Sequence, residues 1–219
     1  MIDTYVFYGD SITSGENNNF KSYVDYLKTD IETILNFGVS GTTIGKYSLY
    51  PVNNYSLESL LEVENPLEAP NWNVFISYGG NDASSVALEY TKAENVLIDF
   101  VRCVDLIRQK YRNCKITFLG LTSVYPILLH LASKHRKYLE TIYFKDINSE
   151  LNFDNFIYKW CNVYYQISKA ASKLCDNTIM LLSDNFNLST DMDEDELHPN
   201  DVGYQKMAER LEQELSKAE

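Results

Sequence analysis

The chain has 219 residues, a formal net charge of −12 and 45% hydrophobic residues. This size and composition suit one soluble α/β domain with a buried core. The negative charge disfavours nucleic acid and anionic membrane surfaces as partners, and no apolar run approaches the roughly 18 residues of a membrane span. The first ten residues, MIDTYVFYGD, lack the basic and apolar regions of a signal peptide, so the sequence predicts a cytoplasmic protein.

Short β-prone runs alternate with longer runs of helical periodicity along the chain. This alternation predicts a parallel sheet covered by helices on both faces, hence a three-layer α/β/α fold that forms a single domain over residues 1–219. The expected strands, in chain order, are residues 4–8, 31–37, 74–78, 115–121 and 178–182. The expected helices are residues 20–29, 56–62, 91–111, 153–174 and 201–217.

Residues 122–152 do not fit this minimal pattern. They contain Pro126 and an apolar ILLHLA run. A connection of this length in a compact domain is often a lid or a binding element, and a surface decoration is the alternative. We expect His130 and His135 in this insertion to face solvent or a lid contact, and the basic cluster at 134–137 to be a solvated helix face.

The four cysteines show no CxxC spacing, and two of them fall within or directly after one predicted helix. Cys161 and Cys175 would lie about 21 Å apart along that helix, which is too far for a disulfide. Scattered thiols of this kind are typical of a reducing compartment, and their spacing does not match a zinc site. We therefore expect neither a metal nor a cofactor.

Polar, glycine-containing loops follow the predicted strands. Gly9-Asp10-Ser11 follows the first strand, GVSG at 38–41 the second and GGND at 79–82 the third, and an acidic loop ending in Asp195-Glu196-Leu197-His198 follows the last. Ligands of open parallel sheets bind beyond the carboxyl ends of the strands. The loops therefore predict one functional site at this edge of the sheet.

Four stretches in these loops resemble the sequence blocks of the GDSL-type, or SGNH, hydrolases. YGDSITSGE resembles the nucleophile block, NFGVSGTT the glycine block, YGGND the asparagine block and DELHPNDVGY the Asp-x-x-His block. They occur in the family's order between residue 8 and about residue 204. The resemblance implies a flavodoxin-like sheet of five parallel strands and a serine esterase activity.

The resemblance also implies a role for each matching residue. Ser11 would be the nucleophile, His198 the general base and then acid, and Asp195 the group that orients His198. The oxyanion hole would consist of the backbone N–H groups of Ser11 and Gly41 and the side-chain amide of Asn81. A histidine base also predicts that activity rises as the imidazole loses its proton.

Four further residues are candidates for contact with the substrate: Asp10, Thr42, Asp82 and Tyr125. Asp10 has a structural alternative, because it can bind the amides of its own turn. Thr42 departs from the family, many of whose members have an acidic residue there. Gly38 is expected to form a strand-end turn rather than to donate to an oxyanion.

The substrate class is less clearly indicated. The resembling family includes carbohydrate O-acetylesterases, lysophospholipases, thioesterases and acyltransferases, and a shared fold does not choose among them. Tyrosine and asparagine in the loops suit a sugar, although the whole chain has 17 tyrosines and its composition can account for them. The ILLHLA run could instead line an acyl-chain groove. The loop residues that suit a sugar substrate are Tyr47, Tyr50, Tyr55, Asn17, Asn18, Asn19, Asn53 and Asn54.

We therefore predict an esterase that acts on short-chain O-acyl groups, acetyl above all, of a saccharide or another small ester. The alternatives are a lipid acyl hydrolase or thioesterase, a sugar O-acyltransferase, and a binding module that uses the same cleft without catalysis.

Overall fold

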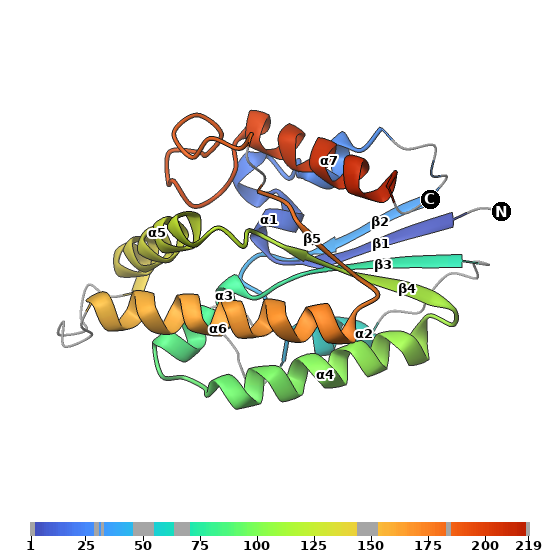
Figure 1. The fold of residues 1–219 in the computed structure, drawn as a ribbon, viewed down its shortest axis with the longest axis horizontal. Helices are drawn as coiled ribbons and strands as arrows, with labels where there is room; N and C mark the ends of the chain where they lie inside the picture. The colour runs from blue at the N-terminus through green and yellow to red at the C-terminus, as the bar shows by residue number, and fades with distance from the viewer. Residues whose placement is uncertain are drawn as a thin grey trace.

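The protein is described by a computed structural model that covers residues 3–28, 31, 33–45, 55–63, 71–143, 153–182 and 185–217. Five parallel strands form one sheet in the order β2-β1-β3-β4-β5 (Figure 1). This is the strand order of flavodoxin-like folds, so the predicted fold class is confirmed. The strands are β1 (Asp3–Gly9), β2 (Thr33–Gly38), β3 (Asn71–Ser77), β4 (Cys114–Gly120) and β5 (Asn177–Met180).

Helices cover both faces of the sheet. Helix α7 lies on one face, and α4 and α6 lie on the other (Figure 1). Helix α6 begins and ends at the residues that its apolar periodicity predicts. The helices in the described residues are α1 (Ser11–Ser14), α2 (Leu57–Val63), α3 (Gly80–Ala87), α4 (Ala93–Lys110), α5 (Tyr125–Tyr143), α6 (Phe153–Leu174) and α7 (Asp201–Leu215).

The central strands are buried on both faces and are apolar along most of their length. In β1, Val6, Phe7 and Tyr8 are fully buried, and the Phe7 ring stacks on Phe75 of β3 at 4.5 Å. Both faces of a covered parallel sheet exclude water, so such strands need no alternation of polar and apolar residues. The register pairs Gly9 with the last residues of β2 and β3, so the loops after these three strands start at the same level.

The predicted helix at 20–29 is wrong in type and length. The structure has only a short 3₁₀ helix, η2 (Tyr23–Tyr26). Phe20 has a φ of 60°, which an α-helix does not contain, and Leu27 is extended with a ψ of 128°. A capping box between Ser22 and Asp25 starts the turn, and Leu27 stops it after one turn.

The insertion contains a long helix that the sequence analysis treats as a connection. Helix α5 occupies residues 125–143 and packs against α6 beside the carboxyl ends of the strands (Figure 1). The remainder of the predicted lid segment, residues 144–152, lies outside the described residues. The same holds for residues 46–54, which include Tyr47, Tyr50, Asn53 and Asn54 of the predicted sugar-binding loops.

Three features of the chain bear on the function classes considered. None of the helices in the described ranges is both long and apolar enough to span a bilayer. All four cysteines are free thiols. Within the same ranges, no group of three or more histidine, cysteine or acidic side chains is arranged to hold a metal ion.

Candidate active site

Ser11 lies at a sharp change of direction between β1 and α1. Asp10 caps the helix, because its Oδ1 accepts a hydrogen bond from the backbone N–H of Ile12 at 3.1 Å. Gly15 ends the helix after four residues with a φ of 67°, in the left-handed region that glycine adopts readily. The strand, the cap and the short helix together hold Ser11 beyond the carboxyl end of β1.

Gly38 lets the neighbouring strand pack against this turn. It is the last residue of β2, and a Cβ atom there would lie 2.4 Å from the backbone nitrogen of Ser14 in α1. Backbone atoms cannot give way as the end of a flexible side chain can. The absence of a side chain at Gly38 therefore allows α1 to sit close to the sheet.

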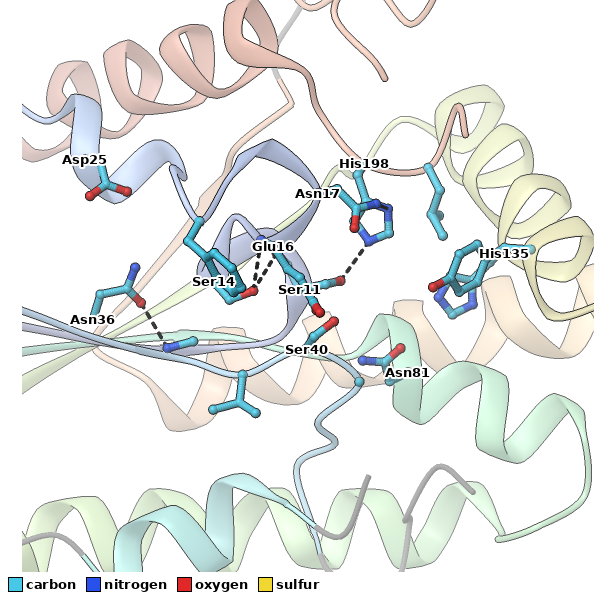
Figure 2. A pocket seen from close by; sticks show the side chains of 16 residues that line it. Ser11, Ser14, Glu16, Asn17, Asp25, Asn36, Ser40, Asn81, His135 and His198 are labelled. Carbon is cyan, nitrogen blue, oxygen red and sulfur yellow. Dashed lines mark hydrogen bonds between the residues drawn. The ribbon is translucent and has the colours of Figure 1, made fainter. Parts of the chain in front are cut away.

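Ser11, His198 and Asp195 form one hydrogen-bonded group, the Ser–His–Asp cluster. Oγ of Ser11 lies 2.8 Å from Nε2 of His198, although the two residues are 187 positions apart (Figure 2). Nδ1 of His198 lies 2.6 Å from Oδ2 of Asp195. Oδ1 of Asp195 accepts the backbone N–H groups of Leu197 and His198, each at 2.9 Å. The backbone of this loop therefore holds the carboxylate of Asp195 in place.

The electrostatics of the cluster suit proton transfer from the serine. Burial by itself would raise the pKa of Asp195, but the hydrogen bond and charge of His198 and two backbone N–H groups lower the pKa to about 2. Asp195 is therefore ionised at neutral pH and accepts the proton on Nδ1. That tautomer, assigned from the hydrogen-bond network, leaves the Nε2 lone pair to accept from Ser11.

Asn17 is a functional candidate that the sequence indicates only as part of an asparagine-rich loop. It belongs to the 3₁₀ helix η1 (Glu16–Asn18), and its Nδ2 donates to Oδ2 of Asp195 at 2.9 Å. The same nitrogen lies 2.7 Å from Nδ1 of His198. Because the Nδ1 proton is directed at Asp195, the amide hydrogen of Asn17 serves the carboxylate and not the ring.

The three expected oxyanion donors converge on the same cavity. Ser11, Gly41 and Asn81 all line it. Gly41 has a φ of 74°, a conformation that residues with side chains rarely adopt. Nδ2 of Asn81 donates to the carbonyl oxygen of Thr42 at 2.9 Å, and its second hydrogen is available for another acceptor. The structure therefore places the three expected donors around one cavity.

The cavity has a volume of about 820 Å³, and most of the residues that line it have polar side chains. Helix α5 forms one side of it. The ring of Tyr138 lies edge-on to the ring of His198, with centroids 6.1 Å apart, and Lys134 forms an ion pair with Glu196 of the loop that carries His198. The insertion therefore contacts the Ser–His–Asp cluster. The lining residues are Ser11, Ser14, Glu16, Asn17, Phe20, Asp25, Asn36, Gly38, Val39, Ser40, Gly41, Asn81, His135, Tyr138, Leu197 and His198.

The four predicted substrate contacts lie outside this lining. Asp10, the N-cap residue before Ser11, is buried, and burial raises its pKa to about 6. Thr42 is buried and donates through Oγ1 to the carbonyl oxygen of Val39 at 2.5 Å. Asp82 is also buried and accepts from the backbone of the loop after β2. Tyr125 lies in a separate groove of about 310 Å³ between α5 and α6.

His135 is buried, in contrast to the expected solvent or lid contact. Only 8% of it is exposed, and its Nδ1 lies 2.5 Å from Oγ of Ser84 in α3. Burial lowers the pKa of His135 to about 3, so the ring is neutral at neutral pH. The basic cluster at 134–137 is thus interrupted by one inward-facing residue. His135 also lines the cavity of Ser11 (Figure 2).

Comparisons with solved structures agree with the fold. A psychrotrophic esterase from Pseudoalteromonas, solved with monoethylphosphonate as inhibitor, is 16% identical with a TM-score of 0.58, covering 98% of this chain and 97% of its own. A family 3 carbohydrate esterase from Clostridium thermocellum is 18% identical with a TM-score of 0.55, covering 99% and 98%. A lipase from a goat rumen metagenome is 16% identical with a TM-score of 0.56, covering 97% of each chain.

The sequence itself identifies the family. A search of curated proteins gives no match. The GDSL-like Lipase/Acylhydrolase family, by contrast, matches residues 7–206, which include the four loops at the carboxyl ends of the strands. The chain therefore belongs to the GDSL-like lipase/acylhydrolase family of carboxylic-ester hydrolases.

Proposed function

We propose that the protein removes short acyl groups, acetyl above all, from hydroxyl groups of a saccharide, through a Ser11-linked acyl-enzyme. The observation that carries this proposal is the 2.8 Å contact between Ser11 Oγ and His198 Nε2 in a cavity lined by many polar side chains. A serine hydroxyl is a poor nucleophile until a base accepts its proton, and this contact supplies the base.

In the first half of the reaction, Ser11 Oγ attacks the ester carbonyl carbon and its proton passes to His198 Nε2. The carbonyl oxygen becomes negative and accepts hydrogen bonds from Gly41, Asn81 and the backbone of Ser11. The intermediate then collapses, the bond to the alcohol oxygen breaks, and Nε2 gives its proton to that oxygen. Asp195 keeps Nδ1 protonated and stabilises the imidazolium that forms between these steps.

Water completes the cycle by the same route. Its oxygen attacks the acyl carbon while Nε2 takes its proton. The bond to Ser11 Oγ then breaks, and Nε2 returns the proton to Oγ. The carboxylic acid leaves, and the serine and the neutral imidazole are regenerated.

The lining of the cavity supports a small polar substrate. Phe20, Val39 and Leu197 are its apolar side chains, and the remaining side chains carry polar or charged groups. The ILLHLA run at 127–132, which could have formed an acyl-chain groove, contributes no residue to this lining. Leu128, Leu131 and Ala132 of that run are instead buried in the core. A long acyl chain would thus meet polar side chains as well as apolar ones in this cavity.

A chain-length series of p-nitrophenyl esters tests the proposal. We expect turnover to be greatest with acetate, and Ser11→Ala to abolish it and to prevent covalent labelling by a fluorophosphonate. Ser14→Ala is the matched control for labelling, because Ser14 lines the same cavity but its hydroxyl donates to the carbonyl of Ser11. Wild-type turnover by Ser11→Ala would refute the mechanism.

The same series separates the alternative activities. A lipid acyl hydrolase or thioesterase predicts turnover that rises beyond butyrate. A sugar O-acyltransferase predicts that an added sugar acceptor becomes acylated at the expense of hydrolysis. Either result would overturn the proposed acetyl-ester hydrolysis while leaving Ser11 as the nucleophile.

A further inference from the structure

The side chain of His135 is held in one orientation by buried partners outside the Ser–His–Asp cluster. Its Nδ1 lies 2.5 Å from Oγ of Ser84, and that oxygen accepts the indole N–H of Trp160 at 3.0 Å. The Trp160 ring stacks in parallel on Tyr164 of the same helix, with centroids 5.3 Å apart. Ser84, Trp160 and Tyr164 are each at most 1% exposed, so the imidazole has a rigid support.

The other edge of the ring carries Nε2. His135 lines the cavity of Ser11 (Figure 2), and its Nδ1 edge is occupied by Ser84. Among the described residues, Nε2 of His135 has no hydrogen-bond partner, and it is not sealed from solvent. His135 is more than nine-tenths buried, and its unpaired nitrogen thus belongs to a residue that lines the cavity of Ser11.

A neutral imidazole matches a hydroxyl group in either tautomer. If Ser84 donates to Nδ1, Nε2 carries the proton and donates; if Nδ1 donates to Ser84, Nε2 accepts. A substrate hydroxyl both donates and accepts, so it pairs with Nε2 in both cases. A methylene in the same place would displace water from Nε2 and leave the nitrogen without a partner, which is costly in a buried site.

We infer that His135 is a specificity-determining residue that hydrogen-bonds a hydroxyl of the alcohol part of the substrate and thereby favours polyol esters over alkyl esters. The inference rests on the proposed function, because it concerns the cavity of the same Ser–His–Asp cluster. It adds a residue from the insertion that selects the alcohol without taking part in proton transfer.

Two acetate esters of matched shape provide the test. In both 6-O-acetylglucose and cyclohexylmethyl acetate, an acetoxymethyl group is attached to a six-membered ring. Only the sugar carries hydroxyls. We compare the ratio of their kcat/KM values in the wild type, His135→Asn and His135→Gln. Asparagine keeps a polar atom near the position of Nδ1 and loses Nε2, whereas glutamine places an amide near the position of Nε2.

His135→Asn is expected to lower the preference for the sugar ester about 10- to 100-fold, the range for an unpaired buried polar group, and His135→Gln to restore part of it. The ratio is independent of the folded fraction, since both esters compete for the same enzyme. An unchanged ratio, or an equal loss on both esters, would overturn the inference. Failure of the proposed function would appear separately, because the Ser11→Ala variant would then hydrolyse one or both acetates at the wild-type rate.

Discussion

Asn17 donates its side-chain amide to Oδ2 of Asp195 at 2.9 Å, and the same oxygen lies 2.6 Å from Nδ1 of His198. The carboxylate is therefore held by a residue from the loop after α1 as well as by its own loop. This contact links the segment that carries Ser11 to the segment that carries His198.

Asn17→Ala should lower kcat by about 10-fold, because it removes one hydrogen bond to a charged group that orients the imidazole. Asn17→Asp should lower it further, since a second carboxylate would face Asp195 and repel it. Initial rates on p-nitrophenyl acetate measure both effects. Asn18→Ala is the matched control, because Asn18 lies in the same 3₁₀ helix but donates to the carbonyl of Lys21. Equal rates for the Asn17→Ala and Asn18→Ala variants would contradict the prediction.

Asn81→Ala should lower kcat by about 10²- to 10³-fold, the usual cost of one lost oxyanion donor, with a much smaller change in KM. Asn81→Asp should be at least as impaired, because a carboxylate cannot donate and would repel the oxyanion. Steady-state kinetics with p-nitrophenyl acetate give the two parameters. A thermal unfolding midpoint close to that of the wild type would show that the loss is not one of folding. A change confined to KM would argue for ground-state binding instead.

Gly38→Ala should destabilise the protein by about 1–3 kcal/mol, because the added Cβ would lie 2.4 Å from the backbone of Ser14. Activity should fall as well, since α1 must move and Ser11 moves with it. Gly80→Ala is the control, because a Cβ there would meet Trp160 at 3.8 Å, an ordinary contact. Urea unfolding of both variants measures the difference. Similar stabilities would show that α1 relaxes easily.

Asp10→Asn should stabilise the protein more at pH 7.5 than at pH 4. Burial raises the pKa of Asp10 from 3.8 to about 6, so the folded protein retains a proton that the unfolded chain releases between these values. Stability from this group therefore falls as pH rises through that window, by about 3 kcal/mol in total. Asparagine keeps an oxygen that can accept from Ile12 and carries no charge.

Urea unfolding at the two pH values measures this effect. The exposed Asp105 in α4 provides the control, because Asp105→Asn removes the same charge from a solvated position. A stability gain from Asp10→Asn that is the same at both pH values would contradict the proposed cost of burying the charge.

Much of the fold could be predicted because its periodic signals are local. Helix α6 has an apolar stripe over 22 residues, and its bounds match the expectation. The region at 20–29 shows the limit of such signals. Tyr23 and Val24 are buried as the pattern suggests, but one turn suffices to bury them, so their spacing does not distinguish a helix from a single turn.

Helix α5 could have been predicted from the helical spacing of its apolar residues, although Pro126 at its second position suggests a break. Proline is nevertheless well tolerated in the first turn of a helix, where its missing N–H has no partner. The buried positions that follow have helical spacing and include position 135. A helical reading of the insertion would therefore have placed His135 on the inner face. These positions are Leu128, Leu131, Ala132, His135 and Leu139.

Asn17 was not predictable in this way. Its partner Asp195 lies 178 positions away, and nothing in the sequence around Asn17 distinguishes it from Asn18 and Asn19. The Ser–His–Asp cluster differs because each of its members lies in a block that resembles a known family. A positioning contact between two loops has no such local signature.

The Ser–His–Asp cluster lies in segments that follow the strands of the sheet, whereas α5 contributes His135 and Tyr138 to the cavity. Substitutions in residues 122–143 can thus change which alcohols the cavity accepts without changing the residues of the Ser–His–Asp cluster. Grafting residues 122–143 between relatives would exchange this selectivity as one module, provided that the contact between His135 and Ser84 travels with it.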